Sequence, residues 1–320
     1  MLPAMADVTE GLPRVHAPII RARFVMEMAS EMISDSYPDY REARVEFRGQ
    51  TPIVLDSSSA VDAVDMVVSG RSALAMTNPS AFLTLAYRGQ GPWKTPQPVR
   101  ALCVLPSKDT CTFAAVAATG LSRFEDIAAK KYPLKLAVRE SRDHSLHMVL
   151  EHLMAAVGFS AADVKSWGGE FRYETTPRRP KLESVAAGAD SFFDEAIRSW
   201  LSQSIDAGVR ILSISEPTMQ KLEAMGYRRA MIKKADYPEL PADVIALDFS
   251  GWPVFVHADT PDAAVTRMCA GLEARKHLIP WDGDGPLPLE RMCRSTPDTP
   301  LDVPLHPAAE KFWKARGYLG

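Results

Sequence analysis

The chain has 320 residues, of which 46% are hydrophobic and 24% charged, and its net charge is −3. This composition is typical of a globular protein, and it does not favour a nucleic acid as partner because there is no overall positive field. No apolar stretch approaches the roughly 20 residues that span a bilayer. Since single cores rarely grow beyond about 250–300 residues, we expect two domains.

The N-terminus lacks the features of a secretory signal. Residues 1–11 contain a proline, two acidic residues and no apolar h-region. As the chain is written we expect a cytoplasmic location, whereas a longer or processed N-terminus would place it in the periplasm. The four cysteines lack the paired C-x-x-C spacing of a zinc or thioredoxin site, so we expect buried thiols. Pairing of Cys103 with Cys111 across adjacent strands stays open.

The first predicted elements are a helix, a strand and a second helix. Apolar residues between Val25 and Ile33 form one helical stripe, and a strand with alternating faces follows at residues 43–47. The serines at residues 57–59 can cap the next helix, and Gly70 is placed to end it. A rhythm of strands and helices therefore starts near residue 41.

The next stretch forms one complete strand–helix unit. A strand is predicted at residues 72–76, and the cap residues Thr77, Asn78 and Pro79 follow it. Proline suits the first turn of a helix, where its missing N–H costs nothing. The helix itself runs from residue 80 to 87 and ends at Gly89.

Two extended segments come next, at residues 99–105 and 112–117, around a polar turn at residues 106–109. They are placed to carry the chain from one lobe to another. The further predicted elements are strands at residues 134–138, 190–193, 209–214 and 254–257 and helices at residues 146–157, 216–225 and after Pro261.

The alternation of strands and helices predicts an α/β fold, with a mixed sheet flanked by helices in each of two lobes. We expect residues 1–106 and 215–320 to form lobe 1, residues 107–214 to form lobe 2, and hinge strands to join them. The proline-rich stretch 280–307 should run over the surface as an extended arm. A domain interrupted by another in this way is typical of proteins that close on a ligand held in a cleft between two lobes.

Several segments resemble one receptor family in the right order along the chain. Residues 65–93 read DMVVSGRSALAMTNPSAFLTLAYRGQGPW, residues 99–106 read VRALCVLP, and residues 304–320 read PLHPAAEKFWKARGYLG. A DI turn at residues 126–127, AVGFS at 156–160 and GADSFFD at 188–194 add to the likeness. Together they resemble the TRAP-associated extracytoplasmic immunogenic (TAXI) receptors, solute-binding proteins with a type II periplasmic-binding-protein fold.

The resemblance implies a receptor that closes on a small carboxylate and serves a TRAP-type membrane permease. The chain departs from the family at three points. The family usually has a Gly-Gly-Tyr turn where this chain has residues 20–23 and a Gly-Ser-Gly-Thr turn where it has residues 140–144. The export signal that such a receptor needs is the third departure.

In α/β lobes, ligands collect beyond the carboxyl ends of strands, where helix N-termini present free N–H groups. The turn at residues 141–145 follows a strand and opens a helix, so its amides, hydroxyls and guanidinium could converge on a carboxylate. A plain helix cap is the other interpretation. Candidate charge partners are Arg21, Arg23 and Arg142, and candidate polar contacts are Thr77, Asn78, Ser80, Ser141, His144 and Ser145.

Histidines 144 and 147 share a helix face with Glu151, but there is no second cluster of ligands, so we predict no metal and no other cofactor. The adjacent carboxylates Asp194 and Glu195 end a strand and could bind a cationic group, act as acid and base, or only stabilise a helix terminus.

Two tryptophans lie beside glycine-rich backbone, Trp167 before Gly168–Gly169 and Trp252 after Gly251. This combination suits stacking on a planar ligand, although tryptophans are more often part of a core.

The sequence contains no G-x-S-x-G elbow, Walker loop, G-x-G-x-x-G turn or H-E-x-x-H helix. The first hypothesis is therefore a solute-binding protein for a small carboxylate-bearing ligand, and we lean away from an enzyme. The alternative is a cytoplasmic enzyme, such as a decarboxylase, or a ligand sensor on the same fold, with His144, Asp194 and Glu195 in its cleft. A purely structural role ranks third.

Overall fold

The computed structural model describes residues 42–45, 53–56, 60–139, 142, 144–174, 182–195 and 198–319. These residues belong to two compact units, and the first contributes only two short strands. Strands β1 (Glu42–Val45) and β2 (Ile53–Asp56) form an antiparallel pair in that unit. All further elements belong to the second unit.

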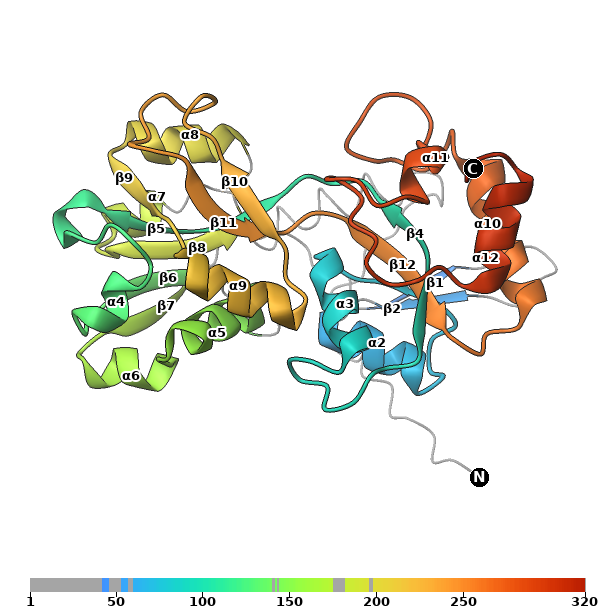
Figure 1. Cartoon of the computed structure of the whole chain (residues 1–320), viewed down its shortest axis with the longest axis horizontal. Coiled ribbons are helices and arrows are strands. Elements are labelled where there is room, and N and C mark those ends of the chain that lie inside the picture. Colours follow the sequence, from blue (N-terminus) through green and yellow to red (C-terminus); the bar gives the residue numbers. More distant parts are fainter. Residues whose placement is uncertain are drawn as a thin grey trace, which may run out of the picture. The chain divides into compact units, whose positions relative to one another are not determined.

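A three-stranded antiparallel sheet forms one part of the second unit (Figure 1). Its strands, in spatial order, are β3 (Ala75–Met76), β12 (Trp252–His257) and β4 (Val99–Leu105). The helices around it are α2 (Ala60–Val68), α3 (Ser80–Arg88), α10 (Asp262–Arg275), α11 (Leu289–Met292) and α12 (Pro307–Ala315). Helix α12 is fixed to the sheet by fully buried Trp313, whose Nε1 donates to the carbonyl of Leu102 at 2.9 Å.

A seven-stranded mixed sheet forms the other part. Its order is β10 (Arg229–Ile232), β11 (Val244–Asp248), β5 (Thr110–Val116), β8 (Ser191–Glu195), β6 (Lys135–Arg139) and β7 (Glu170–Glu174), and β9 (Val209–Leu212) also pairs with β5. Strand β6 is parallel to both β7 and β8. The carboxyl ends of these three strands therefore share one edge of the sheet.

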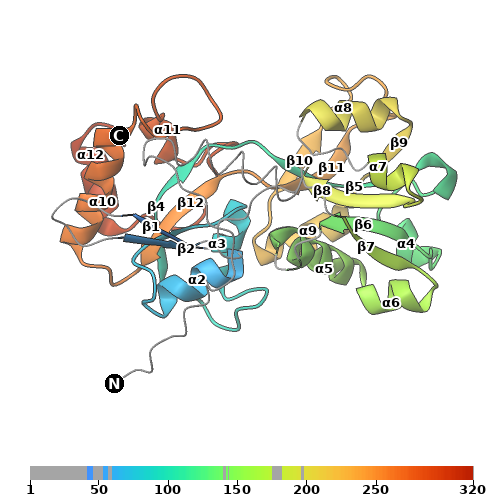
Figure 2. The ribbon, with the colours of Figure 1, turned by 180° about the vertical axis from the view of Figure 1, so that it is seen from behind.

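Apolar side chains cover both faces of this sheet, because neighbouring residues on a strand point to opposite faces. On β5, Phe113 belongs to one buried cluster and Ala114 to another. Figures 1 and 2 show α5, α6 and α9 on one side of the sheet and α8 on the other. The helices and turns of this part are the 3-10 turn η2 (Ala117–Thr119), α4 (Asp126–Ala129), α5 (Ser145–Val157), α6 (Ala161–Ser166), α7 (Leu182–Ala186), α8 (Arg198–Asp206) and α9 (Glu216–Met225).

The chain passes between the two sheets twice, from β4 to β5 and from β11 to β12. The two passages are hydrogen-bonded to each other. The Oγ of Ser250 accepts from the N–H of Asp109 at 3.2 Å, and the N–H of Phe249 donates to the Asp109 carbonyl at 2.9 Å. The N–H of Gly251 donates to Ser107 Oγ at 2.9 Å.

The predicted mixed α/β fold, with two sheets flanked by helices, is confirmed. The seven-stranded sheet continues further along the chain than the boundary expected at residue 214. Strands β10 and β11 belong to it, and the chain returns to the three-stranded sheet only with β12. The assignment of residues to two lobes remains a prediction.

The proline-rich stretch 280–307 packs against the three-stranded sheet. It contains α11, and the side chains of Leu287, Leu289 and Met292 are buried in the same apolar cluster as Trp313. No described helix is long and apolar enough to cross a membrane.

All four cysteines are free thiols with buried side chains. Cys103, Cys269 and Cys293 belong to the cluster under α10 and α12, and Cys111 lies on β5. Cys103 and Cys111 are on different sheets and do not pair.

Candidate functional site

The carboxyl ends of β6, β7 and β8 bring together residues that are far apart in the sequence. Arg139 ends β6, and Asp194 with Glu195 ends β8. Helix α5 starts at Ser145, six positions after the end of β6. This edge, with the first turn of α5, is called the sheet-edge site below.

Arg139 forms ion pairs with both carboxylates of β8. Its Nε lies 3.1 Å from Asp194 Oδ1, and its Nη2 lies 3.3 Å from Glu195 Oε2. The side chain of Asp194 is only 1% exposed, so an unpaired charge there would be costly. The two carboxylates therefore bind the guanidinium of Arg139. From the sequence, a cationic group of a ligand was one of the partners considered for them.

Near neutral pH, Glu195 is present in both its protonated and its ionised form. Its burial, opposed by Arg139 and reinforced by the negative charges of Asp194 and Asp109, raises its pKa from the ordinary value of 4.5 to about 7. The side chain is 23% exposed. A carboxyl with such a pKa can accept or release a proton near neutral pH.

The start of α5 carries the other predicted residues of this edge. His144 is the N-cap, and its Nδ1 accepts from the N–H of Leu146 at 3.2 Å. The guanidinium of Arg142 lies 3.9 Å from the centre of the Tyr173 ring on β7, an arrangement typical of a cation–π contact. The structure thus places Arg142, His144 and Ser145 along the same sheet edge as Asp194 and Glu195.

The two histidines at the start of α5 contact other parts of the protein. His144 caps the helix, and the His147 ring lies 5.7 Å from the Tyr173 ring. Among the residues that the structure describes, no group of three or more His, Cys, Asp or Glu side chains is placed to hold a metal ion.

The turn before α3 lies against the second passage between the sheets. Asn78 Nδ2 donates to the carbonyls of Phe249 and Gly251, both at 3.3 Å, so this side chain holds the turn in place. Thr77 and Ser80 are 2% and 4% exposed, and neither side-chain hydroxyl has a hydrogen-bond partner among the residues that the structure describes. Buried hydroxyls of this kind are unusual in native proteins and are suited to a bound polar group or water.

The two candidate tryptophans do not join the sheet-edge site. Trp167 ends α6 and packs against Phe159, with ring centroids 5.8 Å apart, at the end of the sheet where β7 begins. Trp252 opens β12 in the other sheet, where it pairs with Leu105 and is 39% exposed. Arg21, Arg23 and Ser141 lie outside the described residues.

A cavity of about 560 Å³ lies beside the passages between the sheets, and none of the predicted site residues lines it. Its size falls in the range of small-molecule sites. The sequence signal that could have indicated it is the polar turn at residues 106–109. The lining residues are Lys108, Asp109, Thr110, Glu223, Tyr227, Arg228, Arg229, Ala230, Met231, Asp248, Ser250 and Pro297.

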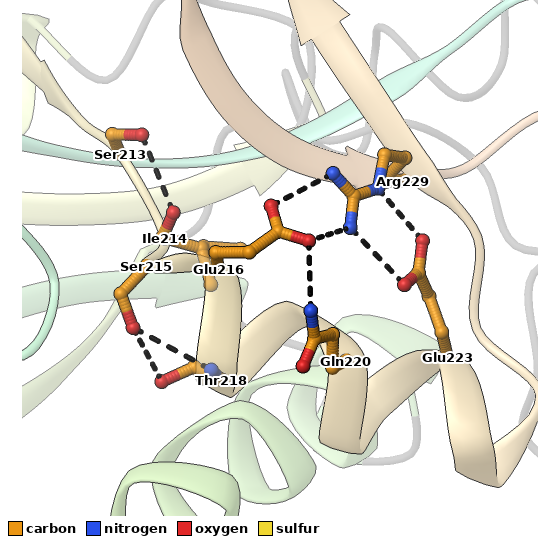
Figure 3. Close-up of polar contacts among 8 residues, drawn as sticks. All are labelled: Ser213, Ile214, Ser215, Glu216, Thr218, Gln220, Glu223 and Arg229. Carbon is orange, nitrogen blue, oxygen red and sulfur yellow. Dashed lines mark hydrogen bonds and ion pairs between the residues drawn. The ribbon is translucent and has the colours of Figure 1, made fainter.

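Arg229 in the wall of this cavity is bound by two glutamates of α9 (Figure 3). Its Nη2 lies 2.7 Å from Glu216 Oε1, and its Nε lies 2.7 Å from Glu223 Oε1. These contacts lower the pKa of Glu216 and raise that of Arg229. These two ion pairs connect α9 to the first residue of β10.

Comparison with known proteins shows distant likenesses of structure. The chain is similar to a protein from Bordetella bronchiseptica, with 12% identity, a TM-score of 0.37, and coverage of 68% of this chain and 58% of that one. It is similar to the ATP phosphoribosyl transferase (HisG:HisZ) complex from Thermotoga maritima, with 11% identity, a TM-score of 0.35, and coverage of 82% and 92%. It is also similar to the glycine betaine/L-proline-binding protein ProX from Borrelia burgdorferi, with 10% identity, a TM-score of 0.33, and coverage of 66% of this chain and 68% of that one.

No family model matches the chain, and no curated protein matches it. The structural matches also include other substrate-binding proteins of transporters. These values describe a distant likeness and say nothing of what this chain binds.

Proposed function

We propose that this protein is a two-lobed solute-binding receptor that holds the carboxylate of a small organic acid at the sheet-edge site. The observation that carries the proposal is the position of Arg142 beside the first turn of α5. A helix of 13 residues has a partial positive charge at its start, where the N–H of Leu146 is already bound by His144. A guanidinium at the same place adds the charge and the hydrogen-bond donors that carboxylates prefer.

The charges around the site support an anion over a cation. Arg139 is already paired with Asp194 and Glu195, so these carboxylates do not offer an open place for a second cation. Arg142 forms no ion pair within the part of the chain that the structure describes. Arg142 therefore remains available for a carboxylate of the ligand.

The finer proposal is a receptor of the TAXI type that works with a TRAP-type permease outside the cytoplasm. The sequence likeness in residues 65–93, 99–106 and 304–320 supports it. Arg21, Arg23 and Ser141 belong to this proposal as further contacts of the acid, and the hydroxyls of Thr77 and Ser80 as contacts from the first lobe.

The test is a thermal-shift screen of the purified protein with mono- and dicarboxylic, aromatic and amino acids. A ligand at one hundred times its Kd stabilises a protein by about 2.7 kcal/mol, which is readily seen as a higher Tm. Arg142→Gln should weaken the binding of the best acid at least tenfold, since it removes a charge-assisted contact of about 1.5–3 kcal/mol.

Arg267→Gln is the matched control, because Arg267 is an exposed arginine of α10 outside the site. It should leave the Kd unchanged. If no acid raises the Tm, or if both variants bind the acid like the wild type, the proposal is wrong.

An enzyme that acts on the same acid is the second candidate, and the observation that favours it is the pKa of Glu195 of about 7. Each stabilising acid should therefore be incubated with the protein and recovered by mass spectrometry. An acid recovered unchanged supports the receptor. An acid that is consumed by the wild type but not by Glu195→Gln supports the enzyme.

A further inference from the structure

The cavity of about 560 Å³ beside the passages between the sheets shares no lining residue with the sheet-edge site, although the charge of Asp109 in its lining acts on Glu195. Its lining comes from the turn before β5, the chain between α9 and β10, the end of β11 and a loop residue, Pro297. Both connections between the sheets therefore contribute to one small-molecule-sized space.

The two arginines that line the cavity already have carboxylate partners. Arg228 is paired with Asp302, with its Nε 3.0 Å from Oδ2, and Arg229 is bound by Glu216 and Glu223. The third lining cation, Lys108, has an exposed side chain and is solvated. Both arginines of the wall are therefore already engaged by carboxylates other than Asp109 and Asp248.

Two aspartates of the lining differ from these arginines in their ion-pair partners. Within the described residues, neither Asp109 nor Asp248 forms an ion pair with a lysine or arginine. Asp248 accepts the N–H of Ser250, at 3.1 Å, through Oδ1. Both side chains are partly buried, and burial is the main cause that raises the pKa of each. The charges of Asp282 and Asp248 add to the rise at Asp109, whereas Ser250 and the charge of Arg228 oppose it at Asp248.

We propose that the cavity is a second ligand site, which binds the ammonium group of a small primary amine between Asp109 and Asp248. An ammonium ion has three N–H donors and one positive charge, and so offers the partners that two partly buried carboxylates lack. The remaining wall, with Tyr227, Ala230 and Met231, provides apolar surface for a short alkyl chain.

Such a ligand would contact both connections between the sheets at once. Asp109 and Ser250 already join these connections through hydrogen bonds, and Asp248 adjoins the second of them. The inference does not depend on the proposed function, because the cavity shares no residue with the sheet-edge site.

The experiment is isothermal titration of the full chain with n-butylammonium chloride, with tetramethylammonium chloride and KCl at equal ionic strength as comparisons. We expect saturable binding of butylammonium only, since the quaternary ion has no N–H donors. Asp109→Asn combined with Asp248→Asn should weaken this binding at least tenfold, because the amide keeps an acceptor for Ser250 but loses the charge.

Two control variants make the outcome decisive. Asp259→Asn changes a carboxylate that is 92% exposed, and Arg142→Gln changes the sheet-edge site. Both should bind butylammonium like the wild type. The proposal is overturned if butylammonium does not bind, if tetramethylammonium or KCl gives the same heat, or if the folded double variant binds as tightly as the wild type. Loss of acid binding in Arg142→Gln with unchanged amine binding would show that the amine does not bind through Arg142.

Discussion

Arg139 determines the charge balance of the sheet-edge site, and it is the residue that the sequence interpretation missed. Asp194 and Glu195 were recognisable as adjacent carboxylates after an apolar strand, but one arginine just past a predicted strand end gives no periodic signal. Only the parallel pairing of β6 with β8 brings its guanidinium within 3.1 Å of Asp194. Pairing between strands 55 residues apart is a tertiary property, which local patterns do not encode.

Glu195 should make stability depend on pH. A carboxyl with a pKa of about 7 in the folded chain and 4.5 in the unfolded chain binds more protons when folded, so stability falls as the pH rises between these values. Glu195→Gln removes this loss, which is on the order of 3 kcal/mol. The variant should therefore have a higher Tm than the wild type at pH 8 and an equal Tm near pH 4.5, measured by calorimetry.

Glu290→Gln serves as the comparison for this titration, because the Glu290 side chain is 71% exposed in its pair with Arg294. Its Tm should follow that of the wild type at every pH. A gain in Tm for Glu195→Gln that does not change with pH would contradict the predicted titration.

Gly251 is a position where no side chain fits. Its φ is +78°, and an added Cβ would come within 2.6 Å of Pro300 Cδ and 2.9 Å of Val104 Cγ1. Gly251→Ala should therefore lower the free energy of unfolding by about 2–4 kcal/mol, the sum of a left-handed backbone and an overpacked core. Denaturation in urea measures the loss, and an unchanged midpoint would show that the turn relaxes.

At the scale of elements, Gly271 is the counterpart of Gly251. Gly271 lies in the interior of α10 and is exposed to solvent. An added Cβ would meet nothing within 4 Å. Alanine at this position should raise the free energy of unfolding by about 0.5–1 kcal/mol, because glycine is the poorer helix former. The same urea titration tests this, and a loss of stability would mean that α10 needs its glycine for packing.

Helix ends were predictable because their signals are local. Gly89 and Gly158 end α3 and α5 with φ of 65° and 103°, and Ser215 caps α9 through the N–H of Thr218. Strands β10 and β11 were not predicted as members of the second sheet. Nothing within residues 229–248 indicates that β11 will pair with β5, more than 130 positions earlier in the chain, as it does at Leu247 and Cys111.

At the scale of the whole molecule, the two sheets of the second unit share a buried apolar cluster. Phe255 and Val99 of the three-stranded sheet belong to it together with Leu136 and Phe193 of the seven-stranded sheet. His152 on α5 and Tyr227 after α9 lie 2.7 Å apart within the same region, joined through His152 Nδ1 and the Tyr227 hydroxyl. Neither sheet can lose its packing without exposing residues of the other.

The second unit should therefore unfold in one transition. Leu136→Ala on β6 and Phe255→Ala on β12 each remove a fully buried side chain, at a cost of about 2–5 kcal/mol. Each variant should shift the tryptophan fluorescence and far-ultraviolet circular dichroism transitions together, to the same lower midpoint. Two separate transitions, with only one displaced by each substitution, would show that the sheets unfold independently.

The candidate site was predictable in part, since the sequence locates turns after strands but not which turns meet. Arg142, His144 and Ser145 were expected at a helix start and are found there. The polar turn at residues 106–109 was visible in the sequence, but not the cavity that it lines, because the other lining residues come from three further stretches of the chain.

The four buried thiols have a practical consequence for spectroscopy. Burial raises the pKa of Cys103 and Cys111 and brings those of Cys269 and Cys293 to about 12, so the thiolate that reacts with maleimides is scarce in the native chain. A cysteine introduced at an exposed residue beside each sheet, such as Asp259 after β12 and Lys221 on α9, would then be labelled selectively with all native cysteines in place. Fluorescent dyes at those two points would report distance changes between the sheets as ligands are added.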